Sequence, residues 1–442
     1  MPIANILGVI IFIAAAVFFS ENRRAINYQN AGRTLGLQFS IALLALAFPF
    51  GVAALNKVTG AIIHVIKFAN EGMYFVFGEL SNWGTMEATL SPAVGHKGVG
   101  TILAFQVFPI IIFLATLFAV LFHLKIMDLV IKSLGSVVRF ITGASRLEST
   151  VSVASIFVGM VEAPLAILPY LKRMTRSQLF TVMSCGMASI AGTVLVVYMS
   201  LGIDGKLLII ASFMAAPGGL LMGKLLIPET HTPFDITKFK ENKNDDTRAT
   251  NLIEAATTGA LTGLRIMLNV IAVIIAFVAM IALLNGIFNG IGGIHWFWQK
   301  SWTINNLLNN ELSLELLFGY VFAPIAWLIG VPSDEVLRAG SFLGQKLVAN
   351  EFLAYLNFTK NMSSFSLQGQ VAITVALCGF ANFVGVGILM AGLGAIVPER
   401  KKEISSLGIK SLLAGSLSNF MSAALVGIVL WIAALMGMSP LG

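Results

Sequence analysis

Long, nearly uncharged apolar runs are the feature that most constrains the fold of this chain. Eleven runs of 17 to 34 residues lie at 3–19, 35–56, 101–124, 150–170, 178–203, 206–228, 258–291, 314–331, 336–358, 371–397 and 408–437. A helix needs about 20 apolar residues to cross a bilayer. Charged residues make up only 11% of the chain, against roughly 25% in soluble domains. The runs exclude a soluble, a disordered or a secreted disulfide-rich protein, and they predict an all-α polytopic membrane protein.

The charges and cysteines exclude several functional classes. The net charge of +7 is explained by Lys and Arg in cytoplasmic loops, so no nucleic-acid partner is expected. The two cysteines lie in apolar runs, and neither they nor the five His form a metal-ligand spacing. The chain has no GxxxxGK[ST] phosphate loop, which argues against an ATP-driven pump. No paired nucleophile and base stands beside its intramembrane carboxylates, so we expect neither an enzyme nor a cofactor.

The runs divide into full spans and interrupted segments. About eight full spans and two shorter broken segments fit the pattern. The stretches 57–71 and 125–147 are amphipathic, which predicts helices along the membrane interface. Residues 229–249 hold nine charges in twenty-one positions. This composition predicts a solvated loop that splits the chain near its middle.

An internal repeat is visible in the sequence. The octamers that begin at Cys185 (CGMASIAG) and Cys378 (CGFANFVG) share the pattern C-G-x-A-[SN]-x-x-G. Each octamer follows a carboxylate, because Glu162 lies 23 residues before Cys185 and Glu351 lies 27 before Cys378. Paired repeats with interrupted apolar segments are typical of secondary transporters, whose sites lie near the membrane midplane. The repeats therefore favour a transporter over a passive channel.

Two carboxylates and one position of the repeat are candidates for binding a ligand or an ion. Glu162 lies in an apolar segment interrupted by Gly and Pro, where a carboxylate is costly unless it is paired or hydrated. The alternatives are that Glu162 ends a helix at the membrane surface and that Glu351 lies on an exposed helix face. Ser189 and Asn382 occupy the same repeat position and could meet a ligand or ion. A hydrogen bond between helices is the alternative for both of these side chains.

Three segments of the chain resemble the concentrative nucleoside transporter family. They are residues 159–164 with their Glu, residues 344–355 (GQKLVANEFLAY), and residues 378–382 (CGFAN). The middle segment is similar to the family signature (G/A)-x-K-x-x-x-N-E-F-V-A, with Leu353 in place of Val. The resemblance covers nearly the whole chain.

The resemblance implies an architecture. Members are homotrimers with eight transmembrane helices, two re-entrant helical hairpins in inverted repeats, and interfacial helices. A scaffold holds the trimer, and a transport part moves the site like an elevator. On this pattern we expect scaffold spans and an interfacial helix at 1–100, the first transport repeat with hairpin 1 at 101–228, a charged loop at 229–257, and the second repeat with hairpin 2 at 258–442.

The resemblance also implies a substrate site. Glu162 at the first hairpin tip is similar to a nucleobase-binding Glu, and Glu351 and Asn382 are similar to residues that hold the ribose hydroxyls. Val194, Ile266 and Phe380 are similar to the apolar wall around the base. Carboxylates suit such a ligand, because charge-assisted hydrogen bonds to hydroxyl and ring N–H groups are strong.

Three positions of the predicted substrate site depart from the family pattern. The first hairpin reads Met160-Val161-Glu162 where relatives have Q-[TS]-E, so two polar base contacts become apolar. A ribose-contacting Ser of relatives is Gly385 here. These departures affect the preference for the base and leave a modified nucleoside open as a substrate.

The resemblance leaves the coupling ion open between proton and sodium. Carbonyls matching Val158 and Ile190 and a hydroxyl matching Ser189 are present, but the Asn that completes the sodium site of relatives is Ser155 here. Proton-coupled members also depart at this position, so the sequence favours a proton, with Glu162 and Glu351 as candidate carriers. A sodium ion at these four residues is the alternative.

Together these observations predict an ion-coupled symporter that imports nucleosides across the cell inner membrane. The alternative substrate is a nucleobase, a modified nucleoside or another small polar metabolite.

Overall fold

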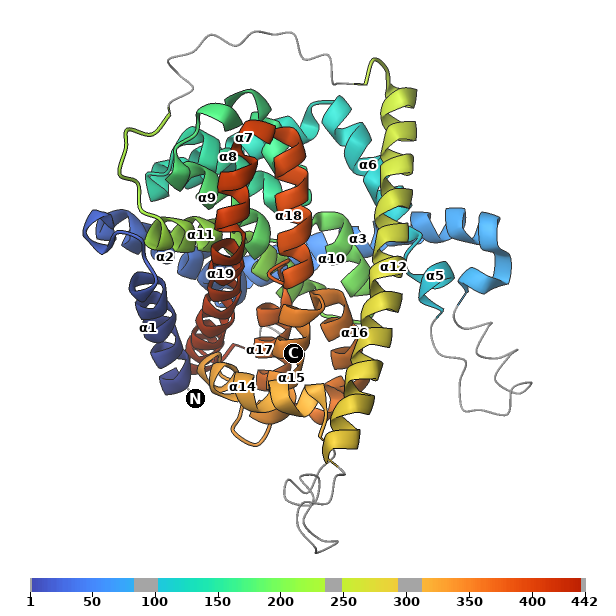
Figure 1. Cartoon of the computed structure of the whole chain (residues 1–442). Coiled ribbons are helices and arrows are strands. Elements are labelled where there is room, and N and C mark those ends of the chain that lie inside the picture. Colours follow the sequence, from blue (N-terminus) through green and yellow to red (C-terminus); the bar gives the residue numbers. More distant parts are fainter. Residues whose placement is uncertain (1, 83–101, 235–248, 293–311, 439–442) are drawn as a thin grey trace, which may run out of the picture.

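A computed structural model describes residues 2–82, 102–234, 249–292 and 312–438 (Figure 1). All regular structure in these residues is helical. The helices are α1 (Pro2–Phe18), α2 (Tyr28–Leu46), α3 (Pro49–Phe77), α5 (Leu103–Gln106), α6 (Ile110–His123), α7 (Ile126–Thr142), α8 (Arg146–Phe157), α9 (Arg176–Ala188), α10 (Gly192–Ser200), α11 (Gly205–Leu226), α12 (Leu252–Gly292), α14 (Leu314–Leu328), α15 (Val336–Val348), α16 (Glu351–Asn361), α17 (Leu367–Leu377), α18 (Phe383–Ile396) and α19 (Lys401–Leu435). Short 3-10 segments are η1 (Arg23–Ala25), η2 (Gly78–Ser81), η3 (Ala163–Arg173), η5 (Met362–Ser364) and η6 (Pro398–Arg400).

The helices confirm an all-α polytopic membrane protein. Six helical segments of the described chain are long and apolar enough to cross a bilayer: Pro49–Ser81, Leu103–His123, Arg176–Ser200, Gly205–Leu226, Leu252–Ile291 and Pro398–Leu435. Shorter apolar helices include α1, α14, α17 and α18.

Two sets of elements follow each other in the same order. The first is α6, α7, a hairpin of α8 and η3, the broken pair α9–α10, and α11. The second is α12, α14, a hairpin of α15 and α16, the broken pair α17–α18, and α19. Each CGxA octamer lies at a helix break, at residues 189–191 and at residues 378–382. The repeat in the sequence is therefore a repeat of architecture.

One apolar run divides differently from the prediction. The run 35–56 reads as a single span, but α2 ends at Leu46 and α3 begins at Pro49. Proline has no N–H and a fixed φ, so it starts a helix well and cannot continue one. The amphipathic stretch 57–71 consequently continues α3 instead of forming a separate helix. Of the predicted charged loop at 229–257, residues 235–248 lie outside the described residues, and α12 already begins at Leu252.

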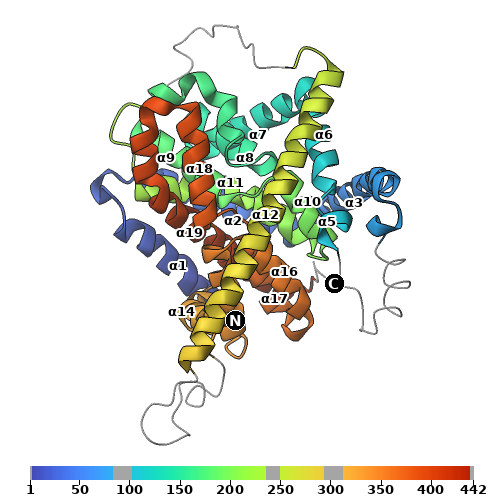
Figure 2. The same cartoon turned by 45° about the vertical axis from the view of Figure 1, so that its right-hand side comes forward.

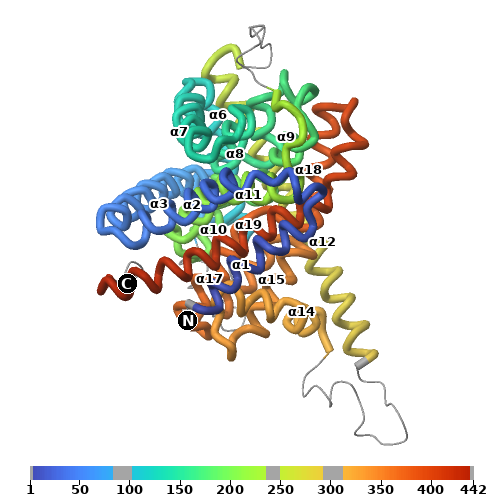
Figure 3. The backbone as a smooth tube through the Cα atoms, turned by 90° about the vertical axis from the view of Figure 1, so that its left-hand side faces the viewer, coloured from blue at the N-terminus to red at the C-terminus, as the bar shows by residue number. Residues whose placement is uncertain are grey.

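The helices form a central bundle with a peripheral group beside it. The pair α9–α10, α11 and α19 pack against one another, and α1 and α2 lie along α19 and α11 (Figure 3). The long helix α12 stands at the edge of the molecule and packs mainly against α6, which in turn contacts α3 (Figures 1 and 2). The second broken pair, α17–α18, packs against α19 as well, so both broken pairs belong to the central bundle.

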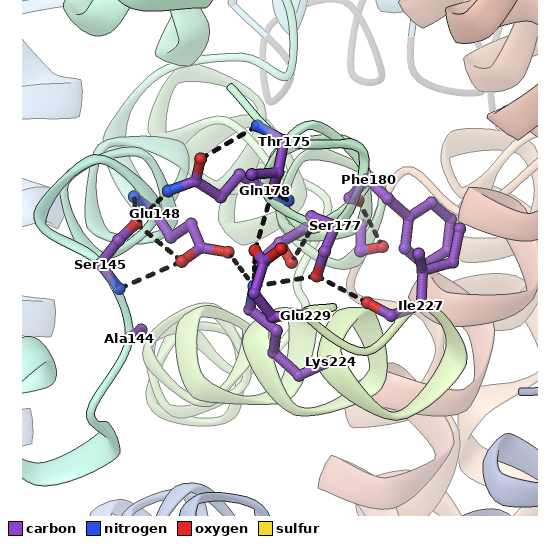
Figure 4. A network of polar contacts seen from close by, with 12 residues as sticks. Ala144, Ser145, Glu148, Thr175, Ser177, Gln178, Phe180, Lys224, Ile227 and Glu229 are labelled. Carbon is purple, nitrogen blue, oxygen red and sulfur yellow. Dashed lines mark hydrogen bonds and ion pairs between the residues drawn. The ribbon is translucent and has the colours of Figure 1, made fainter. Parts of the chain in front are cut away.

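A polar network anchors the base of the first hairpin (Figure 4). The Ser145 hydroxyl and the Glu148 carboxylate form a capping box at the start of α8. The buried Glu148 Oε1 lies 2.6 Å from Lys224 Nζ at the end of α11. Lys224 Nζ also donates to Ser177 Oγ of α9 over 3.0 Å. The network thereby joins the hairpin to α9 and α11 at one end of the bundle.

Candidate functional site

The two helix breaks meet in the middle of the bundle. The backbone N–H of Phe380, in the second break, donates to the Ser189 carbonyl of the first break over 3.0 Å. Helix ends leave carbonyl and N–H groups without intrahelical partners. Each break therefore satisfies part of the backbone of the other, and the two repeats are joined where their regular structure stops.

Asn419 of α19 ties both breaks together. Its Nδ2 donates to the carbonyl of Ala188 over 2.7 Å and to that of Cys378 over 2.9 Å. Gly379 lies beside it, and a Cβ on this glycine would collide with the Asn419 amide and the Ala188 carbonyl. Only glycine leaves room for this crossing.

A buried lysine completes the junction. Lys346 of α15 donates from Nζ to Asn419 Oδ1 over 2.8 Å and to the Ala376 carbonyl, near the end of α17, over 2.7 Å. A buried ammonium is costly unless it is paired, and helix C-terminal carbonyls carry the partial negative charge that stabilises it. Lys346 therefore binds the second hairpin to the helix crossing.

Glu351 and Asn382 are in direct contact. Asn382 caps α18, because its Oδ1 accepts from the Gly385 N–H over 2.6 Å. The Asn382 Nδ2 therefore faces away from the cap, and it donates to Glu351 Oε2 over 2.8 Å. Glu351 is the first residue of α16, where the N-terminal end of the helix favours a carboxylate. The three residues predicted for the ribose end of the site, Glu351, Asn382 and Gly385, thus form one buried, hydrogen-bonded group.

Tyr198 is also part of this group, although it is not among the residues predicted for the site. Its hydroxyl donates to Glu351 Oε1 over 2.9 Å. Tyr198 lies in α10, within an apolar run whose hydropathy does not distinguish one aromatic residue from another. Its hydroxyl was the signal that could have identified it, because a polar group inside a membrane span has to find a hydrogen-bond partner. Lys346 and Asn419 carried a similar signal, as a charge and an amide inside apolar runs.

The residues at the tip of the first hairpin contact other parts of the molecule than the Glu351 group. The Glu162 side chain is exposed and its carboxylate folds back over Gly159. Met160 is buried against Gly186 of α9, and Val161 packs against Gly392 of α18. The structure therefore joins Glu351 to Asn382 but does not join Glu162 to either of them.

The predicted apolar wall lies on the main core. Val194, Ile266 and Phe380 are each half-buried and pack against the largest hydrophobic cluster. They come from α10, α12 and the second break, which are three separate elements. Half-burial leaves part of each side chain available to a ligand.

The predicted ion-binding residues lie on two adjoining elements. Ser155 lies in the last turn of α8, Val158 follows its last residue, and Ser189 and Ile190 lie in the first break. These elements touch, because a Cβ on Gly192 would lie 3.1 Å from the Phe157 carbonyl. The Ser155 hydroxyl is buried and donates to the Ser152 carbonyl over 2.8 Å. The Ser189 hydroxyl donates to the Gly186 carbonyl over 3.3 Å.

Models of protein families match most of the chain. The match to the C-terminus of Na+ dependent nucleoside transporters covers residues 207–427, and the match to their N-terminus covers residues 7–80. A nucleoside recognition model, described as a gate, matches residues 104–204.

Individual proteins also match nearly the whole chain. An uncharacterized transporter of Haemophilus influenzae is 42% identical, with 98% of this chain and 99% of that protein covered. The nucleoside permease NupC of Helicobacter pylori is 39% identical, with 96% and 97% covered.

Solved structures of the protein CNTnw share the fold. Its inward-facing, substrate-bound state has a TM-score of 0.88 and 40% identity, with 97% of this chain and 98% of that chain covered. A variant in an outward-facing state has a TM-score of 0.89 and 41% identity, with 98% and 99% covered. The chain belongs to the concentrative nucleoside transporter family.

Proposed function

We propose that this protein is a secondary active symporter that imports nucleosides, driven by an ion gradient. The observation that carries the proposal is the Glu351–Asn382 pair. A buried carboxylate beside a fixed amide presents acceptors to a vicinal diol and a donor to its oxygens. A site built for hydroxyls rejects analogues that lack them. Family membership and the permease named among the relatives support a nucleoside as the substrate.

The base end of the proposed site is poorer in polar groups. Met160 and Val161, which replace polar residues of relatives, pack the hairpin tip against α9 and α18. Glu162 remains as the polar side chain of the tip. This arrangement supports a second candidate, an importer of a modified nucleoside, a nucleobase or another small polar metabolite with a less polar face.

We propose a proton as the favoured coupling ion. Sodium prefers several oxygen ligands, and Ser155 offers a shorter side chain than the Asn of sodium-coupled relatives. The alternative keeps sodium at Ser155, Val158, Ser189 and Ile190, with water completing the shell. The matching family models, which describe Na+ dependent nucleoside transporters, favour this sodium alternative.

We further propose an elevator mechanism in a homotrimer of the cell inner membrane. The scaffold part at 1–100, which includes the exposed helix α3, would stay fixed, and the bundle that holds both helix breaks would move. Relatives of the same fold in inward-facing and outward-facing states support alternating access. We propose the domain division given by the ranges 1–100, 101–228, 229–257 and 258–442. The packing of α1 and α2 on the bundle is the feature that tests whether residues 1–100 belong to the scaffold.

Counterflow in proteoliposomes tests the function. Labelled uridine and adenosine would be offered with an imposed proton gradient or sodium gradient. We expect uptake that follows the proton gradient and ignores sodium. Sodium-driven uptake would overturn the ion assignment, and exchange of neither nucleoside would overturn the substrate and favour the second candidate.

A further inference from the structure

The hydroxyl of Tyr198, in the first repeat, contacts the Glu351 carboxylate of the second repeat. It donates to Glu351 Oε1 over 2.9 Å, while Asn382 Nδ2 donates to Glu351 Oε2 over 2.8 Å. Each carboxylate oxygen thus receives one donor from a different helix. Because a carboxylate offers about four lone-pair positions, both oxygens keep acceptor capacity for a ligand.

Tyr198 holds its hydroxyl in one place. The side chain is fully buried at 0% exposure. Its ring centroid lies 5.7 Å from that of Phe352 and 4.5 Å from that of Tyr355. A tyrosine has only two side-chain torsions, and close-packed aromatic neighbours leave neither free to change. The hydroxyl is therefore a fixed donor and not an adaptable one.

We propose that Tyr198 is a positioning residue that sets the orientation of the Glu351 carboxylate and so determines selectivity for a vicinal diol. A diol needs one acceptor for each hydroxyl, and two acceptors serve both hydroxyls only when the carboxylate plane is held. Asn382 alone fixes one oxygen and leaves the carboxylate free to rotate about that bond. The proposal rests on the proposed nucleoside substrate and adds a residue from the first repeat to the ribose end of the site.

Tyr355 supplies a matched control. It is also fully buried, and its ring lies against that of Tyr198 at an angle of 42°. Its hydroxyl, however, donates to the Thr374 carbonyl over 2.6 Å. Tyr355→Phe therefore removes a buried tyrosine hydroxyl from the same aromatic cluster without removing a hydrogen bond to Glu351.

The experiment compares binding of uridine and 3′-deoxyuridine to the full chain in nanodiscs. Wild type, Tyr198→Phe and Tyr355→Phe would be measured by titration calorimetry. Hydrogen bonds to charged groups are strong, so we expect Tyr198→Phe to weaken uridine binding by about tenfold. Binding of 3′-deoxyuridine should weaken less, because it presents one hydroxyl fewer, and the preference for uridine should fall. Tyr355→Phe should keep the wild-type preference.

Each outcome decides the proposal. An unchanged preference in Tyr198→Phe would overturn it, as would an equal loss in Tyr355→Phe, which would assign the effect to ring packing. The preference is a ratio of two affinities of the folded fraction, so a loss of stability in either variant does not obscure it. Wild-type protein that binds neither nucleoside would overturn the proposed function and this inference together, whereas wild-type binding with an unaltered Tyr198→Phe would overturn the inference alone.

Discussion

The helices α12 and α11 are opposites in apolarity and in burial. The span of α12 has a mean hydropathy of 2.9, but only 6% of its most apolar window is buried. The span of α11 has a mean hydropathy of 1.6, and 89% of its window is buried. Burial also separates the peripheral α3, with 11% of its window buried, from the α9–α10 pair, with 89% buried. Their mean hydropathies of 1.4 and 1.9 run in the opposite order from those of α12 and α11.

The contrast between α12 and α11 shows that the apolarity of a helix does not indicate its burial in this protein. In a soluble protein the most apolar helix is the most buried one. In a bilayer the outer surface meets acyl chains, and interior positions can instead use small and polar residues that pack closely and hydrogen-bond. The central bundle of this chain holds Gly218 and Gly219 of α11 against Ser418 and Cys185. The most apolar of the six spans, α12, is therefore also the least buried, whereas Tyr198, Glu351 and Asn382 are buried.

The largest effect is expected at the carboxylate of the central bundle. Glu351→Gln replaces one acceptor oxygen by an NH₂ group that faces Tyr198 or Asn382, both of which are donors. Losing charge-assisted bonds to two hydroxyls should lower nucleoside uptake by about a hundredfold or more. Uptake in proteoliposomes measures this, with thermal unfolding as the check on folding. Glu399→Gln, at an exposed carboxylate, is the control, and normal uptake by Glu351→Gln would sink the site assignment.

The second effect concerns the crossing of the helix breaks. Asn419→Leu removes the acceptor of Lys346 and the donor to two carbonyls. Breaking a buried, hydrogen-bonded charge costs about 3–5 kcal/mol, so the midpoint of thermal unfolding should fall strongly. Leu435→Ala, at the exposed end of the same helix, should leave the midpoint nearly unchanged. Similar midpoints for both variants would contradict the role of the junction.

Two side-chain truncations test the difference in burial between α11 and α12. Leu221→Ala in α11 empties a site with 2% exposure, whereas Ile275→Ala in α12 shortens a side chain with 65% exposure. Truncation of a buried leucine costs about 2–5 kcal/mol, and exposed substitutions usually stay within about 0.5 kcal/mol. Chemical unfolding in detergent measures both. A large loss in Ile275→Ala would show that α12 packs against another subunit, which would sharpen the proposed trimer.

The smallest effect is expected at the surface of the bundle. The pKa of Glu21 is lowered by the hydrogen bond from Arg176, against the opposing effect of partial burial, and by Lys410. A lowered folded-state pKa means stability that is present above the unfolded-state pKa and is lost as the pH falls through the folded-state value. Exposed pairs contribute less than about 1 kcal/mol. Unfolding midpoints of wild type and Glu21→Gln should therefore differ slightly at neutral pH and converge in acid, and a constant difference would disagree with this ion pairing.

Much of the fold could be predicted from the sequence, because local signals were strong. The apolar runs gave the membrane class, and the CGxA octamers marked both helix breaks. The division of the run 35–56 was missed, although Pro49 was a visible stop signal. A run of apolar residues fixes neither the direction of a helix nor the point where it turns.

The candidate site was predicted in part. The signature around Glu351 and the octamer around Asn382 identified two residues that are in contact in the structure. Tyr198 escaped because its partner lies 153 positions away along the chain. Glu162 was placed with the site by resemblance, and its contacts in the structure are local to its own hairpin.

The sequence by itself determined that this chain lies in a membrane, that it repeats its architecture, and that carboxylates precede each break. These properties follow from composition and local periodicity. Only the tertiary structure decided that Ser189 meets Phe380, that Asn419 and Lys346 close the crossing, and that a tyrosine of one repeat holds the carboxylate of the other. Such contacts join residues from separate helices, and apolar periodicity carries no information about which polar groups become partners when helices pack.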